Sequence, residues 1–390
     1  MLPPEARAFV ARGLLAAGML TLARQAASAQ SLAPVRARQL GVAPGVFQPG
    51  PNNAITDVSG VLVGQTTVDA GDSVHTGVTA IRPHAGNLYQ DRVPAAIVVG
   101  NGFGKLLGST QVGELGELET PILLTCTLCV WHAADAMVTW LLAQPGMERV
   151  ASINPVVGET NDGGLNAIRS RPITPADVVK ALESAHDGAV EEGSVGAGRG
   201  TQAFSWKGGI GTSSRVLPSS LGGWKVGVLV QTNFGGILQV LGAPVGRELG
   251  NYTFRNNVEG GRGDGSCMIV VATDAPILDR NLRRLAQRAI MGLARTGSFA
   301  GNGSGDYVIA FSTNTALRRH PDQRRPDVQE LTNDEMSALF EAVVEATEES
   351  IYNSLFMATP VTYRGRTTPS IPLDKVRESL RRHGYTGGTR

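Results

Sequence analysis

The residues best suited to chemistry in this chain are a serine and the glycine that precedes it. The sequence runs Gly263-Asp264-Gly265-Ser266-Cys267 and continues into the apolar, β-branched stretch 268–273. Such a stretch is typical of a buried strand. A glycine before the serine allows strained backbone conformations in which a hydroxyl approaches the preceding carbonyl. We therefore predict that the chain is cut at Gly265–Ser266, which makes Ser266 a new N-terminus.

A serine at a chain end carries its own base. A free α-amine has a pKa of about 7.7–8.0, so part of it is neutral at neutral pH and accepts a proton from the hydroxyl. Glycine and serine are also common in ordinary loops. On the pentapeptide alone, the alternative is a loop-to-strand junction with an incidental serine, and the rest of the chain must decide between the two.

Composition places limits on the function. The chain has 390 residues, of which 49 are glycine, and a formal net charge of +1. The length allows one large domain or two smaller ones, and the scattered glycines indicate many tight turns. A net charge near zero provides no electrostatic footprint for nucleic acid or an anionic membrane.

Residues 1–29 have the pattern of a secretory signal. Arg7 and Arg12 are basic, residues 13–23 are apolar, and Ala27-Ser28-Ala29 matches an A-x-A cleavage site. The apolar run is too short to span a bilayer. We therefore predict an exported, periplasmic protein, soluble after removal of the signal near Ala29.

Other motifs point away from metals and cofactors. An odd number of cysteines, Cys126, Cys129 and Cys267, argues against a disulfide scaffold. Cys126, Cys129 and His132 have metal-like spacing, but on the helix expected over 125–142 they do not converge on one ion. The glycine-rich segments 100–104 and 196–200 lack a full phosphate-loop pattern, so we predict tight turns near the site. No metal or cofactor is expected.

Periodicity and capping signals predict interleaved strands and helices. An extended lead-in over 30–52 precedes a single layered α/β domain over 53–390. Strands are expected at 59–67, 95–99, 225–232, 266–273 and 306–312. Helices are expected to begin after Thr174, to cover 279–295, and to run from the capping box Thr332–Glu335 to about Met357.

A set of segments in fixed order resembles one known family. The segments are Asn53-Ala54-Ile55-Thr56-Asp57-Val58, His75-Thr76-Gly77-Val78-Thr79, Asn101-Gly102-Phe103-Gly104-Lys105, Leu118-Glu119-Thr120-Pro121, Val157-Gly158-Glu159-Thr160-Asn161-Asp162-Gly163, Gln231-Thr232-Asn233-Phe234-Gly235, Gly265-Ser266 and Gly303-Ser304-Gly305-Asp306. Over residues 50 to 315 the chain is similar to the L-aminopeptidase D-amidase/D-esterase family, which includes the β-peptidyl aminopeptidases.

The resemblance implies a fold and a processing step. The expected fold is a four-layer αββα sandwich that resembles the N-terminal-nucleophile hydrolases but has a different topology. Self-cleavage would produce an α chain of residues 30–265 and a β chain of residues 266–390. The expected assembly is a homotetramer of such pairs.

The resemblance also implies roles for individual residues. Ser304 matches a second serine that orients the nucleophile's proton, and Asp306 matches an acid that holds this serine and the amine. Some relatives have glutamate at the position of Asp306. Asn233 matches an oxyanion donor. Glu159 matches an acid that receives the substrate's amino group, and Asn161 stands where some members have a tyrosine near the oxyanion.

Together these observations predict an exported, self-processing serine aminopeptidase, amidase or esterase. Its partners would be short peptides, amides or esters, with no nucleic acid or membrane, and the choice among α-L-, D- and β-amino acids stays open. One alternative is an acyltransferase of the ornithine-acetyltransferase type, which shares the fold and self-cleavage but uses threonine. The other is a non-catalytic periplasmic binding protein.

Overall fold

A computed structural model describes residues 32–255, 265–320 and 328–386. The expected export signal at 1–29 and the loop residues Gly263 and Asp264 lie outside the described residues. From Pro34 onward the chain forms one compact unit, and the architecture below refers to that unit.

The larger of two main sheets has six strands in the order β4-β3-β12-β11-β10-β9. The parallel pair β11/β12 lies at its centre, and the other neighbouring strands are antiparallel. Its strands are β3 (Val93–Gly102), β4 (Glu117–Leu118), β9 (Ile210–Val216), β10 (Lys225–Asn233), β11 (Ser266–Thr273) and β12 (Gly305–Ser312).

The smaller main sheet has four strands in the order β1-β2-β5-β6. Its strands are β1 (Leu62–Ala70), β2 (Val74–Arg82), β5 (Ile122–Cys126) and β6 (Val156–Thr160). β5 and β6 run parallel, so that Thr125 pairs with Glu159. An apolar core fills the space between the two sheets and includes Leu124, Val156, Leu229, Met268 and Ile309.

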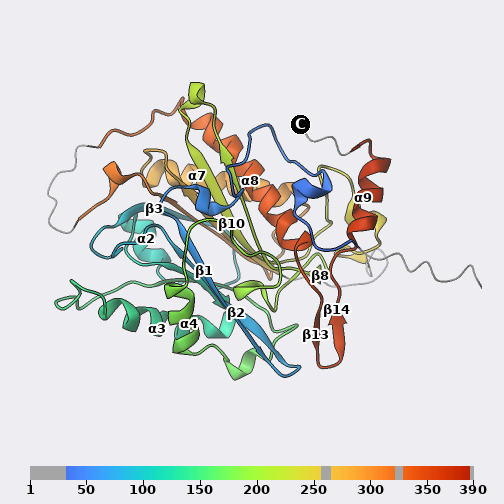
Figure 1. Cartoon of the computed structure of the whole chain (residues 1–390), viewed down its shortest axis with the longest axis horizontal. Helices are drawn as coiled ribbons and strands as arrows, with labels where there is room; N and C mark the ends of the chain where they lie inside the picture. The colour runs from blue at the N-terminus through green and yellow to red at the C-terminus, as the bar shows by residue number, and fades with distance from the viewer. Residues whose placement is uncertain (1–31, 256–264, 321–327, 387–390) are drawn as a thin grey trace, which may run out of the picture. The chain divides into compact units, whose positions relative to one another are not determined.

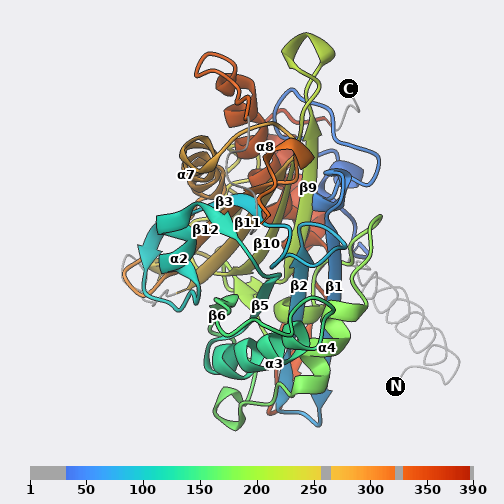
Figure 2. The ribbon, with the colours of Figure 1, turned by 90° about the vertical axis from the view of Figure 1, so that its left-hand side faces the viewer.

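Helices cover the outer faces of both sheets. α7 (Asp279–Arg295) and α8 (Met336–Phe356) pack on the six-stranded sheet, whereas α3 (Val130–Leu142) and α4 (Pro175–Glu183) pack on the four-stranded sheet. Figures 1 and 2 show the two helix pairs on opposite sides of the sheets. A second apolar core lies under α3 and α4. The predicted four-layer αββα sandwich is thus confirmed.

Shorter elements lie around these layers. Two small hairpins are formed by β7 (Gln202–Ala203) with β8 (Trp206–Lys207) and by β13 (Val361–Tyr363) with β14 (Arg366–Thr368). The remaining helices of the described residues are α2 (Ser109–Leu115), α5 (Val245–Glu248) and α9 (Leu373–Arg382).

Local sequence signals predicted several elements correctly. α7 covers the expected range 279–295, and its apolar stripe is buried at Leu282, Leu285, Ala289 and Leu293. Thr174 and Asp177 cap α4 reciprocally. The Glu335 carboxylate accepts hydrogen bonds from the backbone and hydroxyl of Thr332 ahead of α8. The first strand was misplaced by about three residues, because it begins at Leu62 rather than Ser59.

The expected helix over 125–142 is wrong at its start. Thr125 and Cys126 end strand β5, a 3₁₀ turn covers Thr127–Cys129, and the α-helix begins only at Val130. Cys126 and Cys129 form a disulfide, a pairing that the sequence analysis did not anticipate. No glycine or proline separates strand from helix here, so the apolar run concealed the boundary.

A buried ionic network connects the lead-in to α8. Arg215 of β9 is fully buried, and its guanidinium contacts Glu345 at 2.9 Å and Glu349 at 2.8 Å. Glu345 also accepts the backbone N–H of Val46, and Glu349 accepts the side-chain amide of Asn53. Because each carboxylate is shared between Arg215 and the segment before residue 54, the network fixes the lead-in against the sandwich.

We expect Glu349→Ala to lower the free energy of unfolding by about 3–5 kcal/mol, because it leaves Arg215 buried beside too little negative charge. Urea denaturation followed by circular dichroism measures this change. The matched control is Glu378→Ala, which removes the exposed partner of Lys375 and should cost at most about 1 kcal/mol. Equal effects of the two variants would contradict a structural role for the network.

Candidate active site

Strand register brings the predicted catalytic residues together at one end of the six-stranded sheet. Ser266, the first residue of β11, pairs with Asn233, the last residue of β10. On the other side, Cys267 pairs with Asp306 of β12. Met268 and Val270 belong to the core between the sheets, and side chains alternate along a strand. Ser266 therefore also faces the space between the sheets.

The surroundings of Ser266 require glycine at position 265. The Gly305 N–H donates to the Ser266 hydroxyl oxygen at 3.1 Å, and Ser266 is only 5% exposed. A Cβ added to Gly265 would lie 2.0 Å from the Cα of Phe234 and 2.5 Å from the Asn233 carbonyl oxygen. Only glycine allows this approach, so the residue before the serine packs tightly against the end of β10.

Asp306 is a buried carboxylate with no cation within ion-pair distance among the described residues. Asp306 is fully buried, and neither of its oxygens forms a hydrogen bond of normal geometry to a described residue; the same holds for the Ser304 hydroxyl. Burial raises the pKa of Asp306 to about 6, against the opposing influence of the nearby Ser304 side chain and Cys267 backbone amide. The carboxylate thus lies near the Ser266–Cys267 backbone, and no described residue places a countercharge in contact with it.

The side-chain amide of Asn233 is held from both ends. Its oxygen accepts the Gln202 N–H at 2.9 Å, and its nitrogen donates to the Asn161 carbonyl at 3.0 Å. These contacts fix which end of the amide carries the donor. Asn161 therefore contacts Asn233 through its backbone carbonyl. The Asn161 side chain accepts a hydrogen bond from the Gly163 N–H instead.

Glu159 lies on the opposite sheet, at the end of β6. It is 2% exposed and accepts hydrogen bonds from the Lys105 N–H at 2.9 Å and from the Thr127 hydroxyl. Burial raises its pKa, and these hydrogen bonds oppose the shift. A Cβ added to Gly104 would lie 3.1 Å from Glu159 and 3.3 Å from the Cα of Gly305. Glu159 is therefore separated from the Ser266 neighbourhood only by the Gly104–Gly305 contact.

Sequence reasoning missed three supporting residues. Asn101 donates from its side chain to the Ser304 carbonyl at 2.5 Å and to the Gly301 carbonyl at 3.0 Å, which holds the loop before β12. Thr127 and Lys105 hold Glu159. Asn101 and Lys105 are the first and last residues of the segment 101–105 that contributed to the family resemblance. The sequence therefore pointed to the segment but not to the individual roles of these two residues.

Cys267 is not a competing nucleophile. Burial, together with the negative charge of Asp306, raises the pKa of its thiol well above the usual range. The protonated, fully buried thiol is unreactive because the thiolate is the nucleophilic form.

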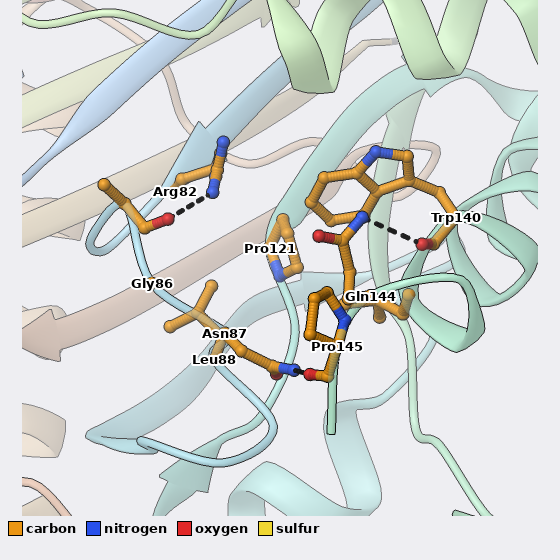
Figure 3. A pocket seen from close by; sticks show the side chains of 10 residues that line it. Arg82, Gly86, Asn87, Leu88, Pro121, Trp140, Gln144 and Pro145 are labelled. Carbon is orange, nitrogen blue, oxygen red and sulfur yellow. Dashed lines mark hydrogen bonds between the residues drawn. The ribbon is translucent and has the colours of Figure 1, made fainter. Parts of the chain in front are cut away.

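A separate cavity lies away from these residues. It has a volume of about 240 Å³ and is lined by the end of β2, the loop that follows it, and the C-terminal part of α3 (Figure 3). The Arg82 guanidinium lies 5.5 Å from the centroid of the Trp140 ring. None of the predicted site residues lines this cavity, so it does not define the candidate active site.

The described parts of the chain contain neither a cluster of metal-binding side chains nor a helix suited to span a membrane. Within residues 32–255, 265–320 and 328–386, no three His, Cys, Asp or Glu side chains are grouped to hold a metal ion. Over the same residues, no helix combines the length and apolar character needed to cross a bilayer.

Comparisons with known proteins agree with this geometry. The model of peptidase family S58 matches residues 53–368. The beta-peptidyl aminopeptidase BapA of Sphingosinicella microcystinivorans is 40% identical over 390 residues, which cover 94% of this chain and 96% of that protein.

Solved structures show the same fold. One is the L-aminopeptidase D-Ala-esterase/amidase of Ochrobactrum anthropi, which is described as a prototype for the serine aminopeptidases and a new variant among the Ntn hydrolase fold. It is 34% identical to this chain with a TM-score of 0.82, and the match covers 90% of this chain and 99% of that one. A beta-aminopeptidase from Burkholderia sp. is 39% identical with a TM-score of 0.81, covering 91% and 100%.

The chain therefore belongs to peptidase family S58. The resemblance predicted from the ordered motifs is confirmed, as is the variant N-terminal-nucleophile hydrolase fold. The protein is a hydrolase of the aminopeptidase class, and its relatives include β-peptidyl aminopeptidases. This membership favours a peptidase over the acyltransferase and the non-catalytic binding protein.

The buried carboxylate of Asp306 should make the stability of the chain sensitive to pH. Its pKa of about 6 exceeds the ordinary 3.8, so the folded chain binds the extra proton between these values and loses stability as pH rises through them. In a chain that carries Ser266→Ala, which removes the predicted cleavage nucleophile, we expect Asp306→Asn to raise the free energy of unfolding by roughly 1–3 kcal/mol at pH 7.5.

The gain should largely disappear near pH 4, because the carboxyl group of Asp306 is then protonated in the folded chain and only partly ionised in the unfolded chain. Urea denaturation of the single and double variants at both pH values measures it. Burial also raises the pKa of Asp162 to about 6. Asp162 is present in both the single and the double variant, so its contribution to stability cancels when the two are compared. A double variant less stable at pH 7.5 would show that Asp306 is already paired.

Proposed function

We propose that this protein is an exported, self-processing aminopeptidase in which Ser266 is the N-terminal nucleophile. The observation that carries the proposal is the buried carboxylate of Asp306, which lies near the Ser266–Cys267 backbone with no countercharge in contact among residues 32–255, 265–320 and 328–386. Cleavage before Ser266 would create an ammonium group at that place. A buried carboxylate is stabilised by such a partner, so the uncut site is complementary to the product of its own cleavage.

In the processing step, the Ser266 hydroxyl oxygen attacks the Gly265 carbonyl carbon. The peptide C–N bond breaks, the nitrogen takes up a proton, and an ester joins Gly265 to Ser266. Water then hydrolyses this ester, which frees the Gly265 carboxylate, the Ser266 hydroxyl and the Ser266 α-amine. The tight packing of Gly265 against Phe234 and Asn233 supports this step, because it holds the backbone on each side of the bond in place.

In the peptidase step, the neutral α-amine of Ser266 accepts the hydroxyl proton while the oxygen attacks the substrate carbonyl. The Asn233 side chain donates to the developing oxyanion, and Ser304 and Asp306 orient the amine. The leaving amine takes the proton, and water hydrolyses the acyl-serine. A free α-amine is partly neutral at neutral pH. Burial favours the neutral amine, whereas the Asp306 carboxylate favours the ammonium form, so the two influences oppose one another at this base.

Glu159 supplies the selectivity for a free amino end. An ammonium ion in a buried site is costly unless it is paired, and Glu159 offers a carboxylate that is 2% exposed and held by Lys105 and Thr127. The Lys105 ammonium lies 3.9 Å from this carboxylate, and substrates with a blocked amino end would add no second cation to it.

The proposed substrates are short peptides, amides or esters. The names of the Sphingosinicella and Burkholderia relatives support β-amino acids at the cleaved end, and the name of the Ochrobactrum enzyme supports esters and amides. The proposal includes export to the periplasm after cleavage near Ala29, α and β chains of residues 30–265 and 266–390, and a homotetramer of these pairs.

N-terminal sequencing of the purified protein tests the nucleophile. We expect wild type to yield two chains, one of which begins Ser-Cys-Met. Ser266→Ala should stay a single chain and be inactive, because it lacks the attacking oxygen. The matched control Ser219→Ala changes an exposed serine and should be cut and active. A single wild-type chain with full peptidase activity would refute the mechanism.

Asn233→Ala tests the oxyanion donor. Loss of one such donor typically lowers kcat by about 10²–10³-fold, and we expect this loss in the steady-state hydrolysis of an amino acid p-nitroanilide. Because the same donor would serve processing, the variant should also be cut slowly. Asn87→Ala, which removes an asparagine from the separate cavity of Figure 3, should retain wild-type turnover. Undiminished kcat in Asn233→Ala would remove Asn233 from this role.

A further inference from the structure

We propose that a cavity beside the β13–β14 hairpin binds the leaving part of the substrate, and that Arg364 and Arg366 recognise its C-terminal carboxylate. The inference rests on the proposed function and specifies its substrate class: short peptides with a free carboxyl end. No residue of this cavity has a role in the processing or peptidase steps above.

The cavity has a volume of about 460 Å³ and two walls. One wall consists of Gly164 and Leu165, from the loop after β6, and Gln202 of β7. The other is the β13–β14 hairpin, including both arginines. This volume lies within the roughly 300–1,000 Å³ range of small-molecule sites, which suits one or two amino acid residues rather than a long chain.

The first wall is built from the elements that hold the oxyanion donor. The Gln202 N–H donates to the Asn233 side-chain oxygen at 2.9 Å, and the Asn233 side-chain nitrogen donates to the Asn161 carbonyl at 3.0 Å. Gly164 follows Asn161 by three residues, and a Cβ added to it would lie 2.5 Å from the Gln202 side-chain nitrogen. The cavity therefore adjoins Asn233 on the side away from Ser266.

The order of the elements gives the substrate a direction. Glu159 lies beside the Gly104–Gly305 contact, at the ends of β3 and β12. Ser266 follows on β11, Asn233 on β10, and Gln202 of β7 lies beyond it. A peptide with its amino end at Glu159 and its scissile carbonyl between Ser266 and Asn233 would extend in the same direction into the cavity.

The charges of the cavity select an anion. Two arginines line it and no acidic side chain does. Among the described residues, neither Arg364 nor Arg366 has a carboxylate in ion-pair distance, and the guanidinium of Arg364 lies 5.1 Å from the centroid of the Tyr363 ring. Guanidinium groups match carboxylates bidentately, so a C-terminal carboxylate is the peptide group that fits this end.

The hairpin that carries the arginines is anchored at three points. The Arg364 N–H donates to the Asp72 carbonyl at 3.0 Å, and the Lys207 N–H donates to the Pro369 carbonyl at 2.8 Å. The His75 ring nitrogen contacts the Thr362 carbonyl at 2.9 Å. Figure 1 shows the β13–β14 hairpin beside the turn that joins β1 to the start of β2. The arginines are therefore presented by a fixed element, which favours specific binding.

The test compares three substrates that share one N-terminal residue: a dipeptide with a free carboxylate, the same dipeptide as its C-terminal amide, and the p-nitroanilide. We expect Arg364→Gln and Arg366→Gln to raise KM for the free dipeptide by about 3- to 10-fold with kcat unchanged. The amide and the anilide should change by less than about twofold, since they lack the carboxylate.

Two controls separate recognition from structure. Arg366→Lys retains the charge and should keep most of the preference for the free dipeptide, whereas Arg377→Gln removes an exposed arginine of α9 and should change nothing. Equal wild-type kcat/KM for the free dipeptide and its amide, or an equal loss on all three substrates in the glutamine variants, would overturn this inference. Absence of wild-type hydrolysis of all three would instead refute the proposed function itself, and the inference with it.

Discussion

The site depends on the hydrogen-bond register among the three strands β10, β11 and β12. This register sets Ser266 opposite Asn233 and Cys267 beside Asp306. A slip of one residue would turn Ser266 toward the helices and move the thiol of Cys267 into the space between the sheets. The register is fixed by apolar side chains on both faces of β11, all of them buried, so the interior of the sandwich determines the geometry at its edge.

The second constraint is electrostatic. Burial raises the pKa of both Asp306 and Glu159, and the two carboxylates lie on different sheets around one serine. Glu159 has the Lys105 ammonium 3.9 Å away, whereas Asp306 has no cation within ion-pair distance among the described residues. Keeping such an acid buried costs stability at that position. Arg215, by contrast, pairs with Glu345 and Glu349 at normal distances. The protein thus pairs its buried charges where α8 meets the sheet and leaves Asp306 without a countercharge among the described residues.

Local signals in the sequence predicted the elements well where they were unambiguous. The range 279–295 and the Thr174 cap were correct because a 3.6-residue stripe and a capping box depend only on near neighbours. The range 125–142 was misassigned because strand and helix are both apolar there and no breaker separates them. The disulfide between Cys126 and Cys129 was missed for the same reason, since it depends on the turn that joins the strand to the helix.

The sequence by itself determined the family, the fold class and the residues to inspect, because ordered motifs and periodicity are properties of the chain alone. Only the tertiary structure decided how these residues are held: the packing of Gly265 on Phe234, the hydrogen bonds at both ends of the Asn233 amide, and the burial of Asp306 without a countercharge among the described residues. These contacts join segments far apart along the chain, and whether a buried polar group has a partner is settled by packing in three dimensions rather than by neighbours in sequence.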